Sequence, residues 1–245
     1  MKRLRTYALP VLALGAAAAL AACSSPATTT AEGGDTSAEQ GAGSGAESGD
    51  GAAEEAAGGS GSTYELSSED LATFLTDQGF ESAGDAGDLT QQAMEGLADA
   101  EIDPAECGDL ATALAPTDHT AMAAGANVQS GSGAAAMVFS DAATAQAAID
   151  AQNEMVQTCP EFTATVQGMT TSAQNAGFEA SIDGADASTG IEQTMEIDGV
   201  PPVTTHTVAV AVGNVVLTTN GLSGDTDAVT SAAQDLTTAF VEAHG

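Results

Sequence analysis

The chain has 245 residues and a formal net charge of −32 at pH 7, because it contains 35 Asp and Glu residues but three Lys and Arg residues. All three cations lie within residues 2–5, so the rest of the chain has no Lys or Arg. Phosphate clamps, Schiff bases and the phosphate contacts of nucleic-acid binding need these cations, and those function classes are excluded. Trp is absent and aromatic residues are few, so stacking platforms for sugars or bases are scarce.

Residues 1–22 have the parts of a secretory signal: a basic start, an apolar run and small residues before Cys23. The apolar run is too short for a membrane-spanning helix. The sequence Leu20-Ala-Ala-Cys23 resembles the bacterial lipobox, in which the Cys is lipidated and begins the mature chain. We therefore expect a lipoprotein anchored through Cys23 on the outer face of the cell membrane, since two acyl chains anchor stably. The alternative is an ordinary secretory signal that leaves a free thiol.

Residues 23–63 comprise the lipidated Cys and a segment of Ser, Thr, Ala, Gly and acidic residues with no aromatic residue. Such a composition has little to bury, so it predicts a disordered tether. The root-mean-square span of this segment is roughly 35 Å by the flexible-chain rule. The folded domain is then expected at residues 64–245.

Cys107 and Cys159 remain as an even pair in an oxidising compartment, which predicts a disulfide. The chain-entropy model gives such a loop a stabilisation of roughly 4 kcal/mol. The alternative is a free catalytic Cys. It would need a nearby base, yet no His lies close to Cys159 in the sequence.

The domain is predicted to open with a helix that Ser67 caps. Asp70 lies three residues further on and completes a capping box. Gly79 ends the helix, and apolar residues at helical spacing form its buried stripe: Leu71, Phe74 and Leu75.

Two further helices are expected before the pattern changes. One spans residues 88–98. The other begins with Asp103 as its cap and Pro104 at its first helical position, and it stops before Pro116. Cys107 lies on the apolar face of this helix and points inward, as a bridging Cys should.

Alternating apolar residues then indicate strands at 120–129, 134–139, 162–166, 178–182 and 191–197. Between the second and third of these, Ser140 is expected to cap a helix that runs to about Thr158. Its stripe is Ala145, Ile149, Gln152 and Val156.

The clearest hairpin signal comes near the end of the chain. Apolar strands at 206–212 and 215–219 flank Gly213-Asn214, which is typical of a two-residue turn. Asp225 then caps a final helix with a stripe of Val229, Ala233, Leu236 and Phe240. The order predicts an α+β domain with N-terminal helices and a C-terminal helix packed on an antiparallel β-sheet.

Several segments resemble one known family: Pro-Ala-Glu-Cys107, Met137-Val-Phe-Ser140, the helix leading into Cys159, and Val212-Gly-Asn-Val-Val-Leu217. Over residues 64–245 the chain resembles the PknH-type extracellular sensor domain of mycobacterial receptor kinases and related actinobacterial lipoproteins. The resemblance implies helices on an antiparallel sheet, a cleft for an unidentified ligand and no catalytic activity. Kinase-linked members carry two disulfides, whereas this chain can form one, and it has no kinase of its own.

The three His residues suggest little chemistry. Asp118-His119 in a predicted loop could supply a base or a metal ligand, although most such pairs are merely solvated. His206 is expected to begin a strand as a half-buried or edge residue, and His244 is expected to lie in a mobile tail.

Two Asp pairs could hold calcium weakly, since Ca²⁺ takes several oxygen ligands. A turn explains Asp183 and Asp186 better, and a helix cap explains Asp225 and Asp227 better. We therefore expect no enzyme, no cofactor and no resident metal.

Three hypotheses about function remain open. The first is a non-catalytic ligand-binding or sensor-like module, with an unidentified small molecule as ligand. The second is an accessory protein that docks on an envelope protein. The third is a cell-wall hydrolase with two carboxylates roughly 5 to 9.5 Å apart. In each the anchor makes the membrane a partner, and nucleic acid is not one.

Salt should stabilise the domain. Because no Lys or Arg pairs with its carboxylates, screening mainly removes repulsion between like charges. We expect a higher melting temperature in 1 M NaCl than in 10 mM NaCl by circular dichroism. An unchanged or lower value would mean that the carboxylates lie too far apart to interact.

Overall fold

The computed structural model describes residues 62–82, 96, 100–114, 119–166, 168–222 and 225–245. The described helices are α1 (Ser68–Asp77), α3 (Ala105–Ala113), α4 (Ala142–Thr158) and α5 (Thr226–His244). The strands are β1 (Glu81–Ser82), β2 (Glu101–Asp103), β3 (His119–Asn127), β4 (Ser132–Phe139), β5 (Glu161–Val166), β6 (Met169–Phe178), β7 (Ala187–Ile197), β8 (Val200–Val212) and β9 (Val215–Leu222). The helix predicted at 88–98 lies outside the described residues.

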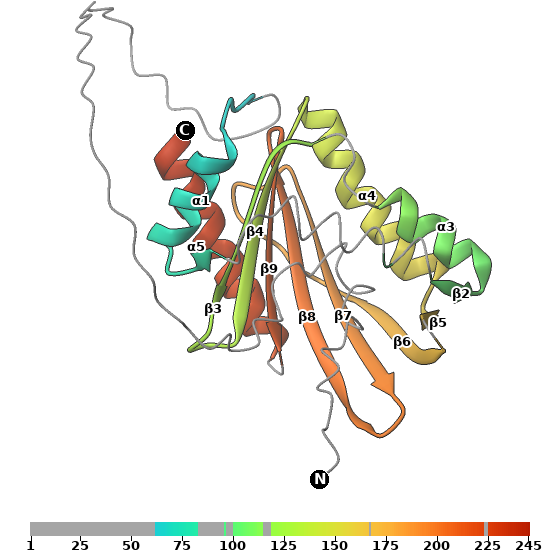
Figure 1. The fold of residues 1–245 in the computed structure, drawn as a ribbon. Helices are drawn as coiled ribbons and strands as arrows, with labels where there is room; N and C mark the ends of the chain where they lie inside the picture. The colour runs from blue at the N-terminus through green and yellow to red at the C-terminus, as the bar shows by residue number, and fades with distance from the viewer. Residues whose placement is uncertain (1–61, 83–95, 97–99, 115–118, 167, 223–224) are drawn as a thin grey trace, which may run out of the picture.

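The strands form one antiparallel sheet of nine in the order β1-β3-β4-β9-β8-β7-β6-β5-β2. Helices α1 and α5 pack on one face of this sheet, and α3 and α4 pack on the other (Figure 1). The predicted α+β class is confirmed.

The first face carries the larger core. Alternate residues of β8 and β9, with β3 and β4 beside them, meet α1 and α5 there. Ser67 caps α1 as predicted, and Asp70 completes the capping box. The hydrogen bond from the Ser67 side chain lowers the pKa of Asp70 below its usual value. The predicted stripe of α5 is also buried: Val229, Ala233, Leu236 and Phe240.

The second face holds α4 and α3. Ala145 and Ile149 of α4 pack on small side chains of the central strands. The cap of α4 is Asp141 and not Ser140, because the Asp141 carboxylate accepts the backbone N–H of Thr144 at 2.8 Å. This hydrogen bond lowers the pKa of Asp141.

The N-terminus of α3 also differs from the prediction. Pro104 is the N-cap and has extended backbone, so it is not the first helical residue. Asp103 belongs to β2, because it pairs with Thr163 of β5. The structure contains the predicted disulfide between Cys107 of α3 and Cys159 at the end of α4, with their Cα atoms 5.7 Å apart. It lies in a small core of its own with Phe162.

Two strand predictions were wrong in position. The segment 178–182 is not a strand: Phe178 ends β6, and Ala180 and Ile182 leave the sheet to pack in the core beneath α5. Strand β6 itself is polar and was missed, because its hydroxyl and amide side chains hide the alternation. Strand β8 begins at Val200, so His206 lies in mid-strand and does not begin it.

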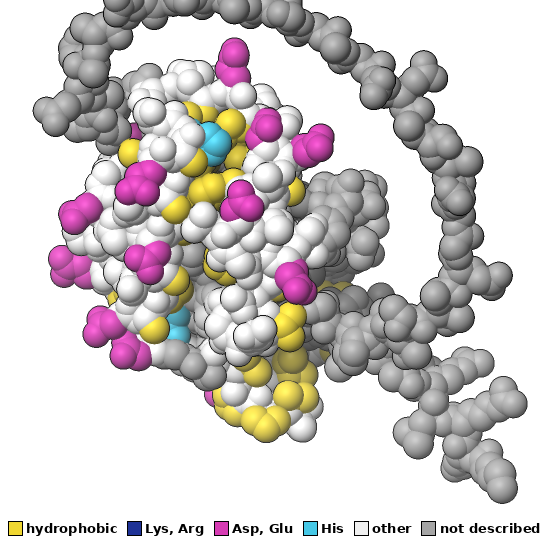
Figure 2. Space-filling view, turned by 90° about the vertical axis from the view of Figure 1, so that its left-hand side faces the viewer, with side chains coloured by type: hydrophobic (Ala, Val, Ile, Leu, Met, Phe, Trp, Pro, Cys, Tyr) yellow, Lys and Arg dark blue, Asp and Glu magenta, His cyan; other side chains and the backbone are white. Residues whose placement is uncertain are grey.

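Carboxylates are spread over the side of the molecule that carries α1 and α5 (Figure 2). Hydrophobic side chains gather at its lower end, where the β7–β8 turn lies in Figure 1. Val200 beside that turn is 48% exposed.

Hydrogen bonds link the β8–β9 turn to the start of the described domain. Asn214 is buried, and its side chain accepts the backbone N–H of Tyr64 at 2.7 Å. Its amide nitrogen donates to the carbonyl oxygens of Tyr64 and Phe139, at 3.1 and 2.8 Å. The predicted Gly213-Asn214 turn is confirmed. Asn214 also links Tyr64 at the start of the domain to Phe139 of β4 by hydrogen bonds.

Asn214→Ala should lower the free energy of unfolding by about 2–3 kcal/mol, because it leaves buried backbone groups without partners. Asn127→Ala is the matched control: its turn hydrogen bonds are exposed, so water can replace them and the loss should stay below about 1 kcal/mol. Urea denaturation measures both. Equal losses of unfolding free energy would mean that the buried hydrogen bonds of Asn214 stabilise the fold no more than the exposed ones of Asn127.

Candidate functional site

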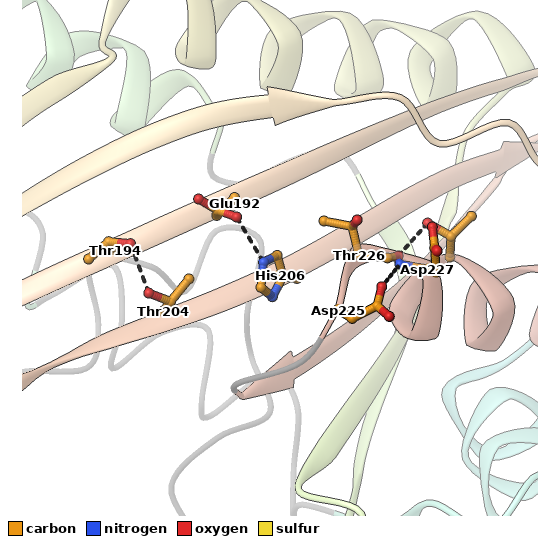
Figure 3. A network of polar contacts seen from close by, with 8 residues as sticks. Glu192, Thr194, Thr204, His206, Asp225, Thr226 and Asp227 are labelled. Carbon is orange, nitrogen blue, oxygen red and sulfur yellow. Dashed lines mark hydrogen bonds and ion pairs between the residues drawn. The ribbon is translucent and has the colours of Figure 1, made fainter.

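One ion pair lies on the face of the sheet that carries α1 and α5 (Figure 3). His206 Nε2 of β8 lies 2.9 Å from Glu192 Oε2 on the neighbouring strand β7. One step further along the strands, the hydroxyls of Thr194 and Thr204 are 2.9 Å apart. The predicted half-buried position of His206 is wrong: this side chain is buried and packs edge-on against the ring of Phe178.

This pair suits a structural role better than a catalytic one. The imidazole is 7% exposed, and its Nδ1 atom is buried with no hydrogen-bond partner. Proton transfer to a substrate needs a ring nitrogen within hydrogen-bond reach of the reacting group. Here one nitrogen contacts Glu192 and the other faces the protein interior.

The other predicted candidates lie apart from one another. His119 begins β3, and Asp118 lies outside the described residues. His244 is not in a mobile tail, because it ends α5 and packs against the rings of Phe74 and Phe240.

Asp183 lies in a turn and Asp225 caps α5 by accepting the backbone N–H of Asp227, as the sequence favoured. Asp186 has a role that the sequence did not predict: it accepts the backbone N–H of Gly213 at 2.7 Å. Within the described ranges, no group of three or more His, Cys, Asp and Glu residues could hold a metal ion.

A different set of polar side chains lies on the face that carries α4. Cross-strand partners share a face and residues alternate along a strand, so the register fixes which side chains lie together. The apolar core beneath α4 includes Ala209 of β8 and Val216 of β9. The next positions on this face are polar, and we call them the threonine–asparagine patch: Thr205, Thr207, Thr218 and Asn220.

All four side chains of the patch are buried, with exposed fractions between 4% and 7%. The buried side-chain atoms that lack a hydrogen-bond partner among the described residues lie elsewhere: Gln152 Oε1, His206 Nδ1, Thr237 Oγ1 and His244 Nε2. The patch is therefore a neutral, polar row within a mostly apolar face of the sheet.

Other polar groups lie near the patch on this face. Thr189 on the same face donates to Asn153 of α4 at 2.7 Å. Gln152, also in α4, is 6% exposed and its Oε1 atom is buried without a partner. Gln152 belongs to the stripe of α4 that is turned inward with Ala145 and Ile149. The helix therefore adds an unpaired acceptor to the same side of the sheet.

The sequence did not reveal the patch. Thr207, Thr218 and the neighbouring Thr219 were read only as strand residues. The sequence did contain one signal for the patch: on one face of β8 and β9, Thr and Asn take the place of Val and Ala. Cys23, the predicted lipidation site, lies outside the described residues.

No protein-family model matches the sequence, and no curated protein matches it. Among solved structures, the chain is similar to the crystal structure of the extracellular domain of PknH from Mycobacterium tuberculosis. The identity is 16% and the TM-score is 0.41, over 57% of this chain and 77% of that chain. The side chains of this protein itself therefore carry the functional argument.

Removing a buried hydroxyl without a partner should stabilise the protein. Thr237 Oγ1 is buried with no hydrogen-bond partner, so Thr237→Val, which keeps the side-chain shape, should raise the free energy of unfolding by about 1 kcal/mol. Thr189→Val, the matched control, breaks its hydrogen bond to Asn153 and should lower it by about 1–3 kcal/mol. Chemical denaturation measures both. A loss at Thr237 as large as that at Thr189 would mean that its hydroxyl is paired.

Proposed function

We propose that this protein is a non-catalytic, ligand-binding lipoprotein held on the outer face of the cell membrane through Cys23. The observation that supports the binding role is the threonine–asparagine patch, a row of neutral hydroxyl and amide side chains on one face of β8 and β9. Such groups both donate hydrogen bonds to a ligand and accept hydrogen bonds from it.

Two observations support the proposed location. The lipobox-like sequence ends at Cys23 where a signal peptide should be cut. The Cys107–Cys159 disulfide fits an oxidising compartment outside the cytosol. None of the described helices has both the length and the apolar character needed to cross a bilayer.

The chemistry of the described residues supports binding over catalysis. The patch holds hydroxyl and amide groups, which donate and accept hydrogen bonds but are weak acids and bases. The one His–carboxylate ion pair in the described part of the chain lies on the opposite face of the sheet. The same arrangement supports a sensor-like role with an unidentified small molecule as ligand.

Metabolic labelling with a palmitate analogue should mark the wild-type protein and leave Cys23→Ala unlabelled. Native mass spectrometry of the protein purified from its own envelope should then detect a bound small molecule. The Thr207→Val/Thr218→Val double variant should lose it, whereas Thr189→Val should keep it. An unlabelled wild type would disprove the anchor, and retention of the molecule by the double variant would disprove the site.

A further inference from the structure

The large apolar side chains that are exposed in the described part of the chain lie at one end of the sheet. Val200 and Val203 lie at the start of β8, Leu222 ends β9, and Val128 follows β3. Their exposed fractions are 48%, 39%, 41% and 74%. We call these four residues the apolar end.

Strand register places the four residues together. The pairing of β9 with β8 ends at Leu222, and Val203 lies just beyond this last pair. Ser132 at the start of β4 pairs with Gly221 of β9, so the β3–β4 turn that carries Val128 lies beside the end of β9. Exposed apolar side chains that gather over adjoining elements mark an interaction site more often than scattered ones do.

The apolar end lies at the far end of the sheet from the point where the described chain begins (Figure 1). Tyr64 is hydrogen-bonded to Asn214 in the β8–β9 turn. Strand β8 runs from Val200 to Val212 beside that turn, and its 13 residues at about 3.3 Å each span about 40 Å. With the proposed anchor at Cys23, the chain from the membrane enters the domain at the opposite end. The apolar end is therefore free to contact a partner beyond the membrane surface.

Carboxylates surround the apolar end. Glu196 and Asp198 lie at the β7–β8 turn, and Asp225 and Asp227 lie at the N-terminus of α5, just after β9. All four residues are exposed. Because the chain has no Lys or Arg after Arg5, a partner must supply the Lys and Arg that pair with these carboxylates.

We propose that the apolar end docks on a partner protein whose surface has an apolar centre and a rim of Lys and Arg. Val200, Val203 and Leu222 bury their surface against this centre, which contributes about 25 cal/mol per Å². The surrounding carboxylates pair with the basic rim and steer the association. This role is additional to the ligand binding proposed above.

Three physical arguments favour this partner over other surfaces. Two copies of a chain with a net charge of −32 repel each other, and so do this chain and anionic lipids. A neutral bilayer would desolvate Glu196 and Asp198 beside the apolar side chains. Pairing with β9 begins at Thr205, and strand addition to the remaining edge of β8 is disfavoured at Pro201 and Pro202, which have no backbone N–H.

Site-specific photo-crosslinking of the full-length chain in intact cells tests the proposal. The photoreactive p-benzoylphenylalanine replaces Val203 or Leu222 in turn. In the matched controls it replaces Ala143 or Ala147, which are exposed on α4. Irradiation should join both positions of the apolar end, and neither position of α4, to one protein other than this chain. Mass spectrometry of the crosslinked peptide should find apolar residues next to Lys or Arg.

Further substitutions separate the apolar contact from the charge. Val200→Asn removes an apolar side chain without adding charge and should lower the crosslink yield about tenfold. Glu196→Gln/Asp198→Asn should also lower it, because two of the carboxylates that face the basic rim are lost. Glu179→Gln/Asp183→Asn is the matched control: it removes two exposed carboxylates away from the apolar end and should leave the yield unchanged.

Other results would overturn the proposal in distinguishable ways. A crosslink to lipid would mean that the apolar end contacts the bilayer, and a crosslink between two copies of this chain would mean self-association. An unchanged yield in Val200→Asn rejects the apolar centre, and an equal effect of the two double variants rejects the basic rim. Equal yields from the α4 positions mean non-specific contact, and no crosslink from the apolar end rejects the surface. Each of these results leaves the ligand site untouched, because the variants that test it lie in the threonine–asparagine patch.

Discussion

The pairing of β8 with β7 and β9 is the constraint on which the rest of the structure depends. Residues alternate between faces along a paired strand, so β8 sends Val208, Val210 and Val212 to α1 and α5. It sends Ala209 and Ala211 to α4. Large side chains fill one core and small ones let a helix approach the other face. A shift of the register by one residue would exchange the two sets and destroy both cores.

The absence of Lys and Arg after Arg5 determines which hydrogen bonds the carboxylates of the domain can make. Carboxylates such as Asp70, Asp141 and Asp225 accept hydrogen bonds from hydroxyls and backbone N–H groups at helix N-termini, since no basic side chain is available. Towards the interior, the polar side chains are mainly Thr, Asn and Gln. The proposed ligand site would therefore be neutral, and its selectivity would come from hydrogen bonds and shape, with the surrounding negative charge disfavouring anions.

The sequence correctly predicted those elements that depend on residues close together in the chain. The capping box at Ser67, the Gly213-Asn214 turn and the stripe of α5 were read correctly, because each depends on residues a few positions apart. The polar strand β6 was missed. The cap of α4 was displaced by one residue, since Ser140 and Asp141 are both good caps and backbone geometry chose between them.

The sequence by itself determined the excess of negative charge, the α+β class and the Cys pair that can bridge. Only the tertiary structure decided that Thr207 and Asn220 would lie side by side on one face, because partners on neighbouring strands are set by register and not by distance in the chain. It also decided that these side chains would be buried. Burial depends on what packs around a residue, and no local pattern encodes that.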